Sequence, residues 1–458
     1  MSKQASLFPE YVEKYFHKVV GKVTEKYNGE NRKPELFYKE MLTEEYSADL
    51  SWGATELNSV ILAADVVSMD SSIPLKKRGS IESATGKIAK IALKYHKGEK
   101  EISDLNIMIA RGSDEATIAG KVMNDVPRCI GGIEYRNQML TEQALSTGSM
   151  LVEQGEENDG VGVRVTFVPA KNERKARVAD WLKHPNIATP QEDVQQLFDA
   201  ADNDQRSIGL LMISKKYFDA WRKTRNGKEM TADYERREYT AATVLRTASR
   251  TLFKQVIEDE YGVELRIVDN TFKVQLPNGD EKDVRPWVEA NVAALPQVKC
   301  GRLVYGTLAE ETNPVNGVDY EKSGSYILVS KYSHNDPLEE FTSGQALCLP
   351  VLDGASGYYI LHANEVSEGA ISVAEEDASL SFEKTKSSKT IEVNYLGDIA
   401  NLSASASQDF VTVSLKAGKL TVTCAANSAD SAPARTATVT ITDGVNKCEI
   451  EVSQAANA

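Results

Sequence analysis

The longest helical pattern in the chain is residues 113–152, SDEATIAGKVMNDVPRCIGGIEYRNQMLTEQALSTGSMLV. Its apolar residues recur at steps of mostly three or four, so they fall on one stripe of a helix, with charged residues on the opposite side. The members of this stripe are Ile118, Val122, Val126, Cys129, Ile133, Leu140 and Ala144. The pattern predicts a long helix that is buried on one side, and an ordinary core helix would show the same pattern.

The ends and the middle of this segment carry helix signals. Ser113 is expected to cap the N-terminus and Gly148 to end the helix. Pro127 removes one backbone hydrogen bond and clashes with the preceding turn, and the Gly131-Gly132 pair weakens the helix further. We therefore expect a kinked helix that bends or breaks at these residues.

The chain has 458 residues, enough for two or three domains, with 26% charged and 41% hydrophobic residues. These values are ordinary for a globular protein in water. No run approaches the ~20 apolar residues of a membrane helix, and the N-terminal MSKQASLFPEYVEKYF lacks the apolar block of a signal peptide. We expect the protein to stay in the cytoplasm where it is made, without a membrane partner.

The net charge of −14 disfavours a grip on nucleic acid, because duplex binding needs clustered Lys and Arg that displace counterions. If DNA lies near this protein, we expect the protein to enclose it without binding it tightly. The cysteines show no CxxC pair and predict neither a disulfide framework nor a zinc site. They are Cys129, Cys300, Cys348, Cys424 and Cys448. The last two could meet on neighbouring strands, but reduced thiols are favoured.

Residues 1–50 mix aromatic and charged side chains without a sustained period. This is typical of a segment that lies along another part of the protein, and a frayed terminus is the alternative. Residues 71–112 form a basic island with two strands expected around a glycine-containing loop. Its basic residues are Lys76, Lys77, Arg78, Lys87, Lys90, Lys94, Lys97 and Lys100. Such a hairpin would contact an acidic patch on another copy or would simply be solvated.

The next part of the chain alternates between helix and strand patterns. Strands are expected at 161–168, 207–214, 263–268, 271–276, 298–305 and 326–330. Thr189-Pro190-Gln191-Glu192 is a capping box that opens a helix to about Ala201, and further helices are expected at 215–225 and 240–261. These patterns predict a mixed α/β unit over 181–325. The strand that begins near residue 326 is expected to join the same layer as the strand that ends at Val168.

From about Asp377 the composition shifts to Ser, Thr, Ala and Val in short alternating runs such as SLSFE, FVTVSL and TATVTIT. Turn signals separate these runs at the spacing of a β-sandwich. The sequence therefore predicts an all-β domain at residues 377–458.

Catalytic and metal-binding patterns are missing from the sequence. The histidines are scattered, and neither paired carboxylates nor a phosphate-binding loop stand at the required spacing. We expect no enzymatic activity, no metal and no cofactor, which favours a structural protein.

Several stretches, in chain order, resemble the major capsid protein E family of tailed phages, the lambda-type branch. They are Ile73-Pro74-Leu75 with the basic island, Glu142 to Gly148, Ala179-Asp180-Trp181 with His184-Pro185 and the Pro190 helix, Gly301 to Gly306, and Asp336-Pro337 leading to Leu349-Pro350-Val351. The resemblance implies an α+β capsid fold of the Hong Kong 97 type. On that template the parts are the N-arm 1–70, the E-loop 71–112, the spine helix and peripheral domain 113–180, the axial domain 181–325, the peripheral return 326–365 and a linker 366–376.

Residues 377–458 are similar to BACON domains, immunoglobulin-like modules common in gut Bacteroidetes proteins. The similarity rests on GKLTV at 418–422, RTATV at 435–439 and VSQ at 452–454. No tryptophan follows Trp287, and Phe410 stands where the second family tryptophan would be, which weakens the case for stacking on sugars.

Together the resemblances imply a major capsid protein that self-assembles through pentamers and hexamers into an icosahedral head around double-stranded DNA, without sequence-specific binding. Implied partners are further copies, portal and scaffold or cement proteins; the implied location is the virion capsid, assembled in the host bacterial cytoplasm. The expected assembly contacts are Lys76, Lys77, Arg78, Lys87, Lys90 and Lys94. The immunoglobulin-like domain would face outward for decoration, stabilisation or adhesion to glycans or host surfaces. The alternative is a BACON-bearing glycan-binding surface protein or polysaccharide-degrading enzyme.

Overall fold

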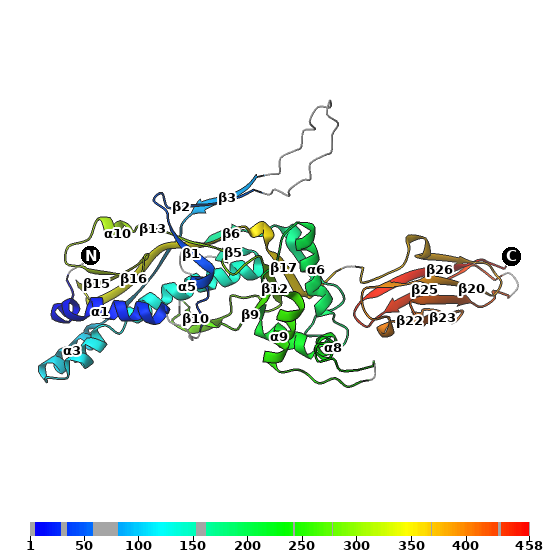
Figure 1. The fold of residues 1–458 in the computed structure, drawn as a ribbon, viewed down its shortest axis with the longest axis horizontal. Helices are drawn as coiled ribbons and strands as arrows, with labels where there is room; N and C mark the ends of the chain where they lie inside the picture. Colours follow the sequence, from blue (N-terminus) through cyan, green and yellow to red (C-terminus); the bar gives the residue numbers. More distant parts are fainter. Residues whose placement is uncertain are drawn as a thin grey trace, which may run out of the picture.

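The computed structural model describes residues 5–28, 34–57, 81–152, 162–240, 243–276, 278–367, 369–428 and 432–457. These residues form an elongated molecule, with the N-terminus near one end and an all-β domain at the other (Figure 1). The α-helices are α1 (Pro9–Asn28), α2 (Tyr38–Met41), α3 (Glu99–Ala110), α4 (Glu115–Val122), α5 (Val126–Thr147), α6 (Pro190–Asn203), α7 (Lys215–Lys223), α8 (Arg225–Tyr234), α9 (Arg250–Tyr261) and α10 (Ala309–Thr312).

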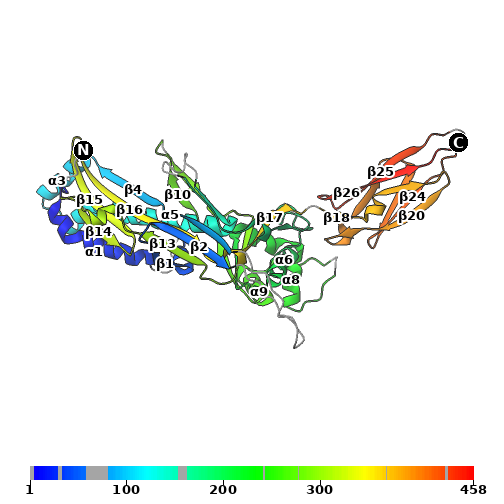
Figure 2. The same ribbon diagram turned by 90° about the horizontal axis from the view of Figure 1, so that it is seen from above.

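The first large sheet has six strands, and α5 crosses one of its faces. Its strands are β1 (Leu42–Tyr46), β4 (Lys90–Lys97), β13 (Gly301–Gly306), β14 (Asp319–Ser323), β15 (Ile327–Asn335) and β16 (Leu338–Leu352). The long strand β16 pairs with β15 along one edge and with β4 and then β13 along the other. Figure 2 shows β4, β16 and β15 side by side, with α1 beside β14.

The second large sheet has five strands in the order β7 (Glu173–Ala176), β17 (Tyr359–Val366), β12 (Asn291–Leu295), β8 (Leu210–Ser214) and β9 (Glu264–Val268). Every residue of β8 is buried because both faces of this sheet are covered. Leu210 and Met212 belong to the apolar core shared with α5 and the first sheet, whereas Leu211 and Ile213 belong to the core under helices α6 to α9. The helices α6 and α7, the buried strand β8 and the end of α9 at Gly262 confirm the sequence predictions.

Four further sheets among the described residues have two strands each. They are β2 (Ser51–Leu57) with β3 (Ile81–Lys87), β5 (Ser149–Val152) with β6 (Val163–Thr166), β10 (Phe272–Gln275) with β11 (Glu281–Val284), and β18 (Ile371–Ser372) with β21 (Asn394–Tyr395). Four 3₁₀ turns in the described residues are η1 (Ala170–Asn172), η2 (Ala355–Gly357), η3 (Glu375–Asp377) and η4 (Ile399–Asn401).

The segment expected to form one kinked helix is two helices followed by a strand. Asp114, not Ser113, caps α4, because its carboxylate accepts a hydrogen bond from the Thr117 backbone N–H. Residues 123–125 form a turn that separates α4 from α5. Pro127 lies in the first turn of α5, where its missing N–H costs no helical hydrogen bond. Gly148 ends α5 in the left-handed conformation, as predicted.

The expected bend at Gly131 and Gly132 is wrong, because α5 runs through both glycines. A Cβ at Gly131 would overlap the Tyr27 hydroxyl of α1, and one at Gly132 would lie 2.6 Å from a Leu93 methyl of β4. Each glycine costs helix stability relative to alanine, by about 1 kcal/mol. Here the two glycines let α1 and β4 pack directly against the α5 backbone.

The N-terminal segment forms helix α1, although no sustained period was expected there. Helix α1 buries one face against α5 and β14. The buried residues are Val12, Phe16, Val20, Val23 and Tyr27. The segment thus lies along another part of the protein, which was one of the two alternatives, and the described part of it is not a frayed terminus.

The pairing within residues 71–112 differs from the expected hairpin. Strand β3 pairs with β2, so the hairpin begins at Ser51, and β4 pairs with β16, about 250 residues later. Residues 99–110 form α3. The residues around β4 do not show that this strand pairs with one about 250 residues later. A hairpin between neighbouring strands was therefore expected.

The division between the two large sheets also differs from the expected domain limits. Strands β13 and β14 lie within 181–325 but belong to the six-stranded sheet. Strand β17 lies within 326–365 except for its last residue, but it belongs to the five-stranded sheet. The strand that begins near residue 326, β15, pairs with β14 and β16. It does not join the strand before Val168, because that strand, β6, pairs with β5. The expected helix 240–261 begins only at Arg250, where Ser249 caps it.

The C-terminal domain consists of two sheets over one apolar core. One sheet has the order β19 (Ser379–Phe382), β26 (Lys447–Gln454), β25 (Arg435–Thr442) and β22 (Ser403–Ala406); the other has β20 (Ser387–Glu392), β24 (Lys419–Cys424) and β23 (Val411–Lys416). Both contribute to the core, for example Val439 and Ile450 from the first and Leu420 and Val422 from the second. The alternating runs in this part of the sequence are therefore strands, as predicted.

Candidate assembly surfaces

The hairpin of β2 and β3 projects from the body. Its strands are antiparallel, from Ser51 opposite Lys87 to Leu57 opposite Ile81. They form a sheet of their own, which leaves the body (Figure 1). An isolated two-stranded hairpin is marginally stable in water. The hairpin is therefore suited to packing against another molecule.

The base of this hairpin is fixed to the body. The buried ring of Trp52 belongs to the apolar core of the body, where its centroid lies 6.0 Å from that of the Phe167 ring. From β13, Arg302 donates to the Gly53 carbonyl over 2.9 Å and pairs with Asp353 at 2.7 Å. These contacts set the direction in which the hairpin leaves the sheet.

The basic residues expected to make assembly contacts lie in three places. Outside the described residues lie Lys76, Lys77 and Arg78. Lys87 ends β3, and Lys90 and Lys94 are exposed on one face of β4, since residues an even number apart share a face of a strand. The ammonium of Lys94 lies 5.4 Å from the centroid of the Phe341 ring. The structure thus places Lys90 and Lys94 on the outer face of the six-stranded sheet, and their role in assembly stays a prediction.

Lys97, another member of the basic island, is not available to a neighbour. It lies on the opposite face of β4 from Lys94 and is buried, where its ammonium pairs with Asp125 and donates to Asn124 over 2.7 Å. A buried charge is stable only when it is paired and hydrogen-bonded. This pair joins β4 to the break between α4 and α5.

A second buried ion pair, unforeseen from the sequence, holds the N-terminal segment. The ammonium of Lys331 lies 3.1 Å from the Glu340 carboxylate, and both side chains are almost completely buried. The carboxylate also accepts from the Ser6 hydroxyl at 2.5 Å and from the Leu7 backbone N–H at 2.9 Å. Burial lowers the pKa of Lys331. Residues 6 and 7 thus complete the hydrogen bonding of Glu340, which fixes the start of α1 on the sheet.

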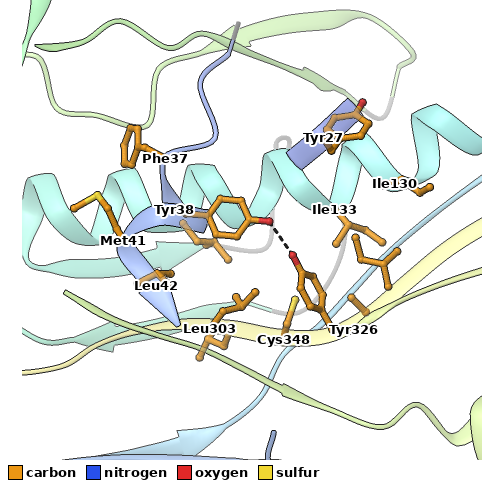
Figure 3. Packing of buried hydrophobic residues seen from close by; sticks show 14 of the residues in the cluster. Tyr27, Phe37, Tyr38, Met41, Leu42, Ile130, Ile133, Leu303, Tyr326 and Cys348 are labelled. Atoms are coloured by element: carbon orange, nitrogen blue, oxygen red, sulfur yellow. Dashed lines mark hydrogen bonds between the residues drawn. The ribbon is translucent and has the colours of Figure 1, made fainter. Parts of the chain in front are cut away.

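The side of α5 that faces α2 carries a hydrogen-bonded polar cluster. The Glu134 carboxylate accepts from the Tyr38 hydroxyl and, at 2.9 Å, from the Lys39 ammonium. The hydroxyls of Tyr38 and Tyr326 are 2.8 Å apart (Figure 3). Burial is the largest cause that raises the pKa of both tyrosines. The cluster joins the N-terminal segment, α5 and the residue that precedes β15.

Glu142, further along α5, is the second acidic centre of this helix. Its Oε1 accepts from Gln138 at 2.9 Å and from Asn270 at 2.5 Å, and Asn270 in turn pairs with the backbone of Glu35. Within the described residues its Oε2 has no hydrogen-bond partner. Burial raises the pKa of Glu142 to about 7. The carboxyl group therefore stands where α5, the N-terminal segment and the loop before β10 meet.

The described residues show no cluster for metal binding, and most of their thiols are buried. Groups of three or more His, Cys, Asp or Glu that could hold a metal are not found among them. All five thiols are free, and burial raises the pKa of Cys129, Cys300 and Cys348 to about 12. In the same part of the chain, helices long and apolar enough to cross a membrane are also not found.

The C-terminal domain is tied to the body where the chain was expected to be a linker. Strand β18 pairs with β21, so residues 371 and 372 belong to the C-terminal domain. The side-chain amide of Asn446 donates to the Val178 carbonyl of the body over 2.7 Å. Tyr395 packs against the cores of both units and donates to Asp443. The junction is therefore a contact surface and not a free linker.

Comparison with known proteins gives structural likeness only. No protein-family model and no curated protein match the chain. The chain is similar to a prophage protein of Escherichia coli CFT073 described as a capsid protein, with 12% identity and a TM-score of 0.45 over 75% of this chain and 97% of that one. A phage-related protein of Bordetella bronchiseptica RB50 has 15% identity and a TM-score of 0.42 over the same shares. A GH5 xyloglucanase of Bacteroides ovatus matches 19% of this chain and 18% of its own, with 30% identity and a TM-score of 0.17.

Proposed function

We propose that this chain is the major capsid protein of a tailed bacteriophage. Copies join as pentamers and hexamers into an icosahedral head that encloses double-stranded DNA. The observation that carries the proposal is the hairpin of β2 and β3, which is fixed at its base and leaves the body as a two-stranded ribbon. A ribbon of this kind gains stability when a neighbouring copy packs on it. The sequence resemblance implies a neighbour-clasping E-loop at residues 71–112, a range that includes β3 but not β2.

Electrostatics determine which contacts such a subunit makes. The net charge of −14 disfavours tight binding of DNA to the wall, so the proposed shell encloses DNA without reading its sequence. The exposed Lys87, Lys90 and Lys94 instead favour an acidic surface of a neighbouring subunit, and they set the register of that contact. A stable capsid subunit needs a large total contact area, on the order of 2,000 Å² or more, shared over many weak contacts.

The other expected partners follow from the same proposal. A closed head of this kind has a portal and is built with a scaffold or cement protein. It is assembled in the cytoplasm of the host bacterium and is part of the virion.

Charge reversal tests the assembly contact. Lys87→Glu, Lys90→Glu and Lys94→Glu together are expected to prevent shell formation by the full chain while leaving its circular dichroism unchanged. The matched control reverses three exposed lysines of the C-terminal domain, Lys384, Lys386 and Lys416, and is expected to form normal shells. Normal shells from the first variant would contradict the role of these lysines.

We further propose that residues 377–458 form an immunoglobulin-like domain of the BACON type that is displayed on the outside of the head. Its two sheets over one core, and its attachment at one end of the elongated chain, support this arrangement. It serves for decoration, stabilisation or adhesion to glycans and host surfaces.

Shells of a chain that ends at Ser367, before β18, separate these roles of the C-terminal domain. Loss of mucin binding with unchanged heat resistance indicates adhesion, and loss of heat resistance indicates stabilisation. Shells that are unchanged in both properties would contradict both roles.

A further inference from the structure

The segment between α8 and α9 is an exposed arm that the proposed function has not used. We define this arm as residues 235–240 and 243–249. Its described residues form neither helix nor strand, and nearly all are exposed or half-exposed. Figure 1 shows it standing away from helices α8 and α9. Long connections without secondary structure are uncommon in compact domains and usually have a function.

The arm carries two adjacent apolar residues, Val244 and Leu245, among basic residues. The side chain of Val244 is 93% exposed, the highest value among the exposed large hydrophobic residues, and Leu245 beside it is half-exposed. In the described part of the chain, Arg236 and Arg246 have no acidic partner, and Arg237 pairs only with Glu235 of the arm. An exposed apolar residue flanked by free guanidinium groups is typical of a segment that packs on an acidic surface with an apolar centre.

A surface of this chemistry exists on the same unit, on α6 and the end of α9. The rings of Phe198 and Tyr261 stack at 4.8 Å, and both are partly exposed. Asp199 and Asp202 stand exposed beside Phe198, and Glu260 lies next to Tyr261. Helix α6 contains four acidic residues and neither Lys nor Arg. We call this surface the α6–α9 face.

We propose that the arm of one copy packs on the α6–α9 face of the next copy in the same ring. In this contact Val244 and Leu245 cover the rings of Phe198 and Tyr261. The guanidinium groups of Arg237 and Arg246 pair with the carboxylates of Asp199 and Asp202. Both surfaces are exposed in a single chain, so each subunit offers an arm and a face at once. A contact between two different surfaces closes into a ring when the rotation between subunits allows it. The inference rests on the proposed capsid function and names the contact that joins subunits within a pentamer or hexamer.

The test uses the full chain and two charge-reversed variants. The arm variant carries Arg237→Glu and Arg246→Glu, and the face variant carries Asp199→Lys and Asp202→Lys. Analytical ultracentrifugation measures the concentration at which each forms rings or shells. We expect either variant alone to need a concentration roughly tenfold higher or more than the unmodified chain.

An equimolar mixture of the two variants separates contact between copies from contact within one copy. In the mixture an acidic arm meets a basic face on alternate subunits, so association into even-numbered rings is expected to return. A control with Lys384→Glu and Lys386→Glu in the C-terminal domain keeps the behaviour of the unmodified chain. The inference is overturned if the arm variant associates like the unmodified chain, or if the mixture stays as poorly associated as its components. If the unmodified chain itself never associates, it is the proposed capsid function that fails.

Discussion

Replacing Glu142 by glutamine removes a buried titrating group while leaving its hydrogen bonds in place. Oε1 of Glu142 accepts both of its hydrogen bonds, from Gln138 and Asn270, whereas Oε2 has no partner among the described residues. An amide oxygen can take the place of Oε1, and the amide nitrogen then occupies the unpartnered position. The Glu142→Gln variant therefore isolates the effect of the charge.

The size of the effect follows from the shifted pKa. Burial, opposed by the two hydrogen bonds and reinforced by the nearby Glu35, raises the pKa of Glu142 from 4.5 to about 7. Between these pH values the folded chain holds a proton that the unfolded chain has released, so the free energy of unfolding falls as pH rises. The expected loss across this window is about 3 kcal/mol, and the contribution is fully present only below pH 4.5. The glutamine variant should lack this loss and be the more stable protein at pH 8.

Urea unfolding followed by tryptophan fluorescence from pH 5 to pH 8.5 measures this difference. All four tryptophans precede residue 288, so the signal reports on the body and not on the C-terminal domain. Asp193→Asn is the matched control, because burial also raises the pKa of Asp193 to about 7 but both of its oxygens accept hydrogen bonds, from Arg177 N–H and Trp181 Nε1. We expect this control to be less stable at pH 5 by about 1–3 kcal/mol, because its amide nitrogen faces a hydrogen-bond donor. As the pH rises to 8.5 it should lose less stability than the unmodified chain, because it also lacks a titrating group of raised pKa. Equal pH dependence in the Glu142→Gln variant and the unmodified chain would refute the reasoning.

Three further predictions concern stability and reactivity. Gly131→Ala is expected to destabilise the body by about 1–3 kcal/mol because the added methyl group overlaps Tyr27. Gly120→Ala has open space around it and should stabilise the body by about 0.5–1 kcal/mol. Equal effects of the two substitutions in urea unfolding would contradict the packing of α1 on α5. Asp114→Ala should cost about 1 kcal/mol as the loss of a helix cap and Ser113→Ala less than about 0.5 kcal/mol, and the reverse order would show that Ser113 caps α4. At pH 8 a thiol reagent should leave Cys129, Cys300 and Cys348 unmodified in the folded chain, since burial keeps these thiols protonated, and should react with them after unfolding. Mass spectrometry measures the labelling, and rapid labelling of the folded chain would argue against burial of these thiols.

Elements with a strong local pattern were predictable from the sequence. The Pro190 helix, the apolar strand β8 and the alternating strands of the C-terminal domain lie where their patterns place them. Helix α1 was missed although its buried residues stand at helical spacing, because aromatic and charged residues alternate around them. In β4, residue parity alone separates the exposed Lys94 from the buried Lys97, so this distinction was available in the sequence.

Contacts between distant parts of the chain were not predictable. Strand β4 pairs with β16, Glu340 accepts from Ser6, and Glu142 meets Asn270, and in each case the partners are more than 100 residues apart. A polar residue on the inner face of a strand or helix signals that a partner is needed but does not say which one. The same limit applies to Gly131 and Gly132, where the sequence shows weak helix formers and only the structure shows Tyr27 and Leu93 against them.

Electron microscopy of the purified full chain over a range of concentrations tests the proposed function most directly. We expect closed shells built of pentamers and hexamers, or capsomers that close into shells when a scaffold protein is added. Single subunits at every concentration, with and without a scaffold, would contradict it.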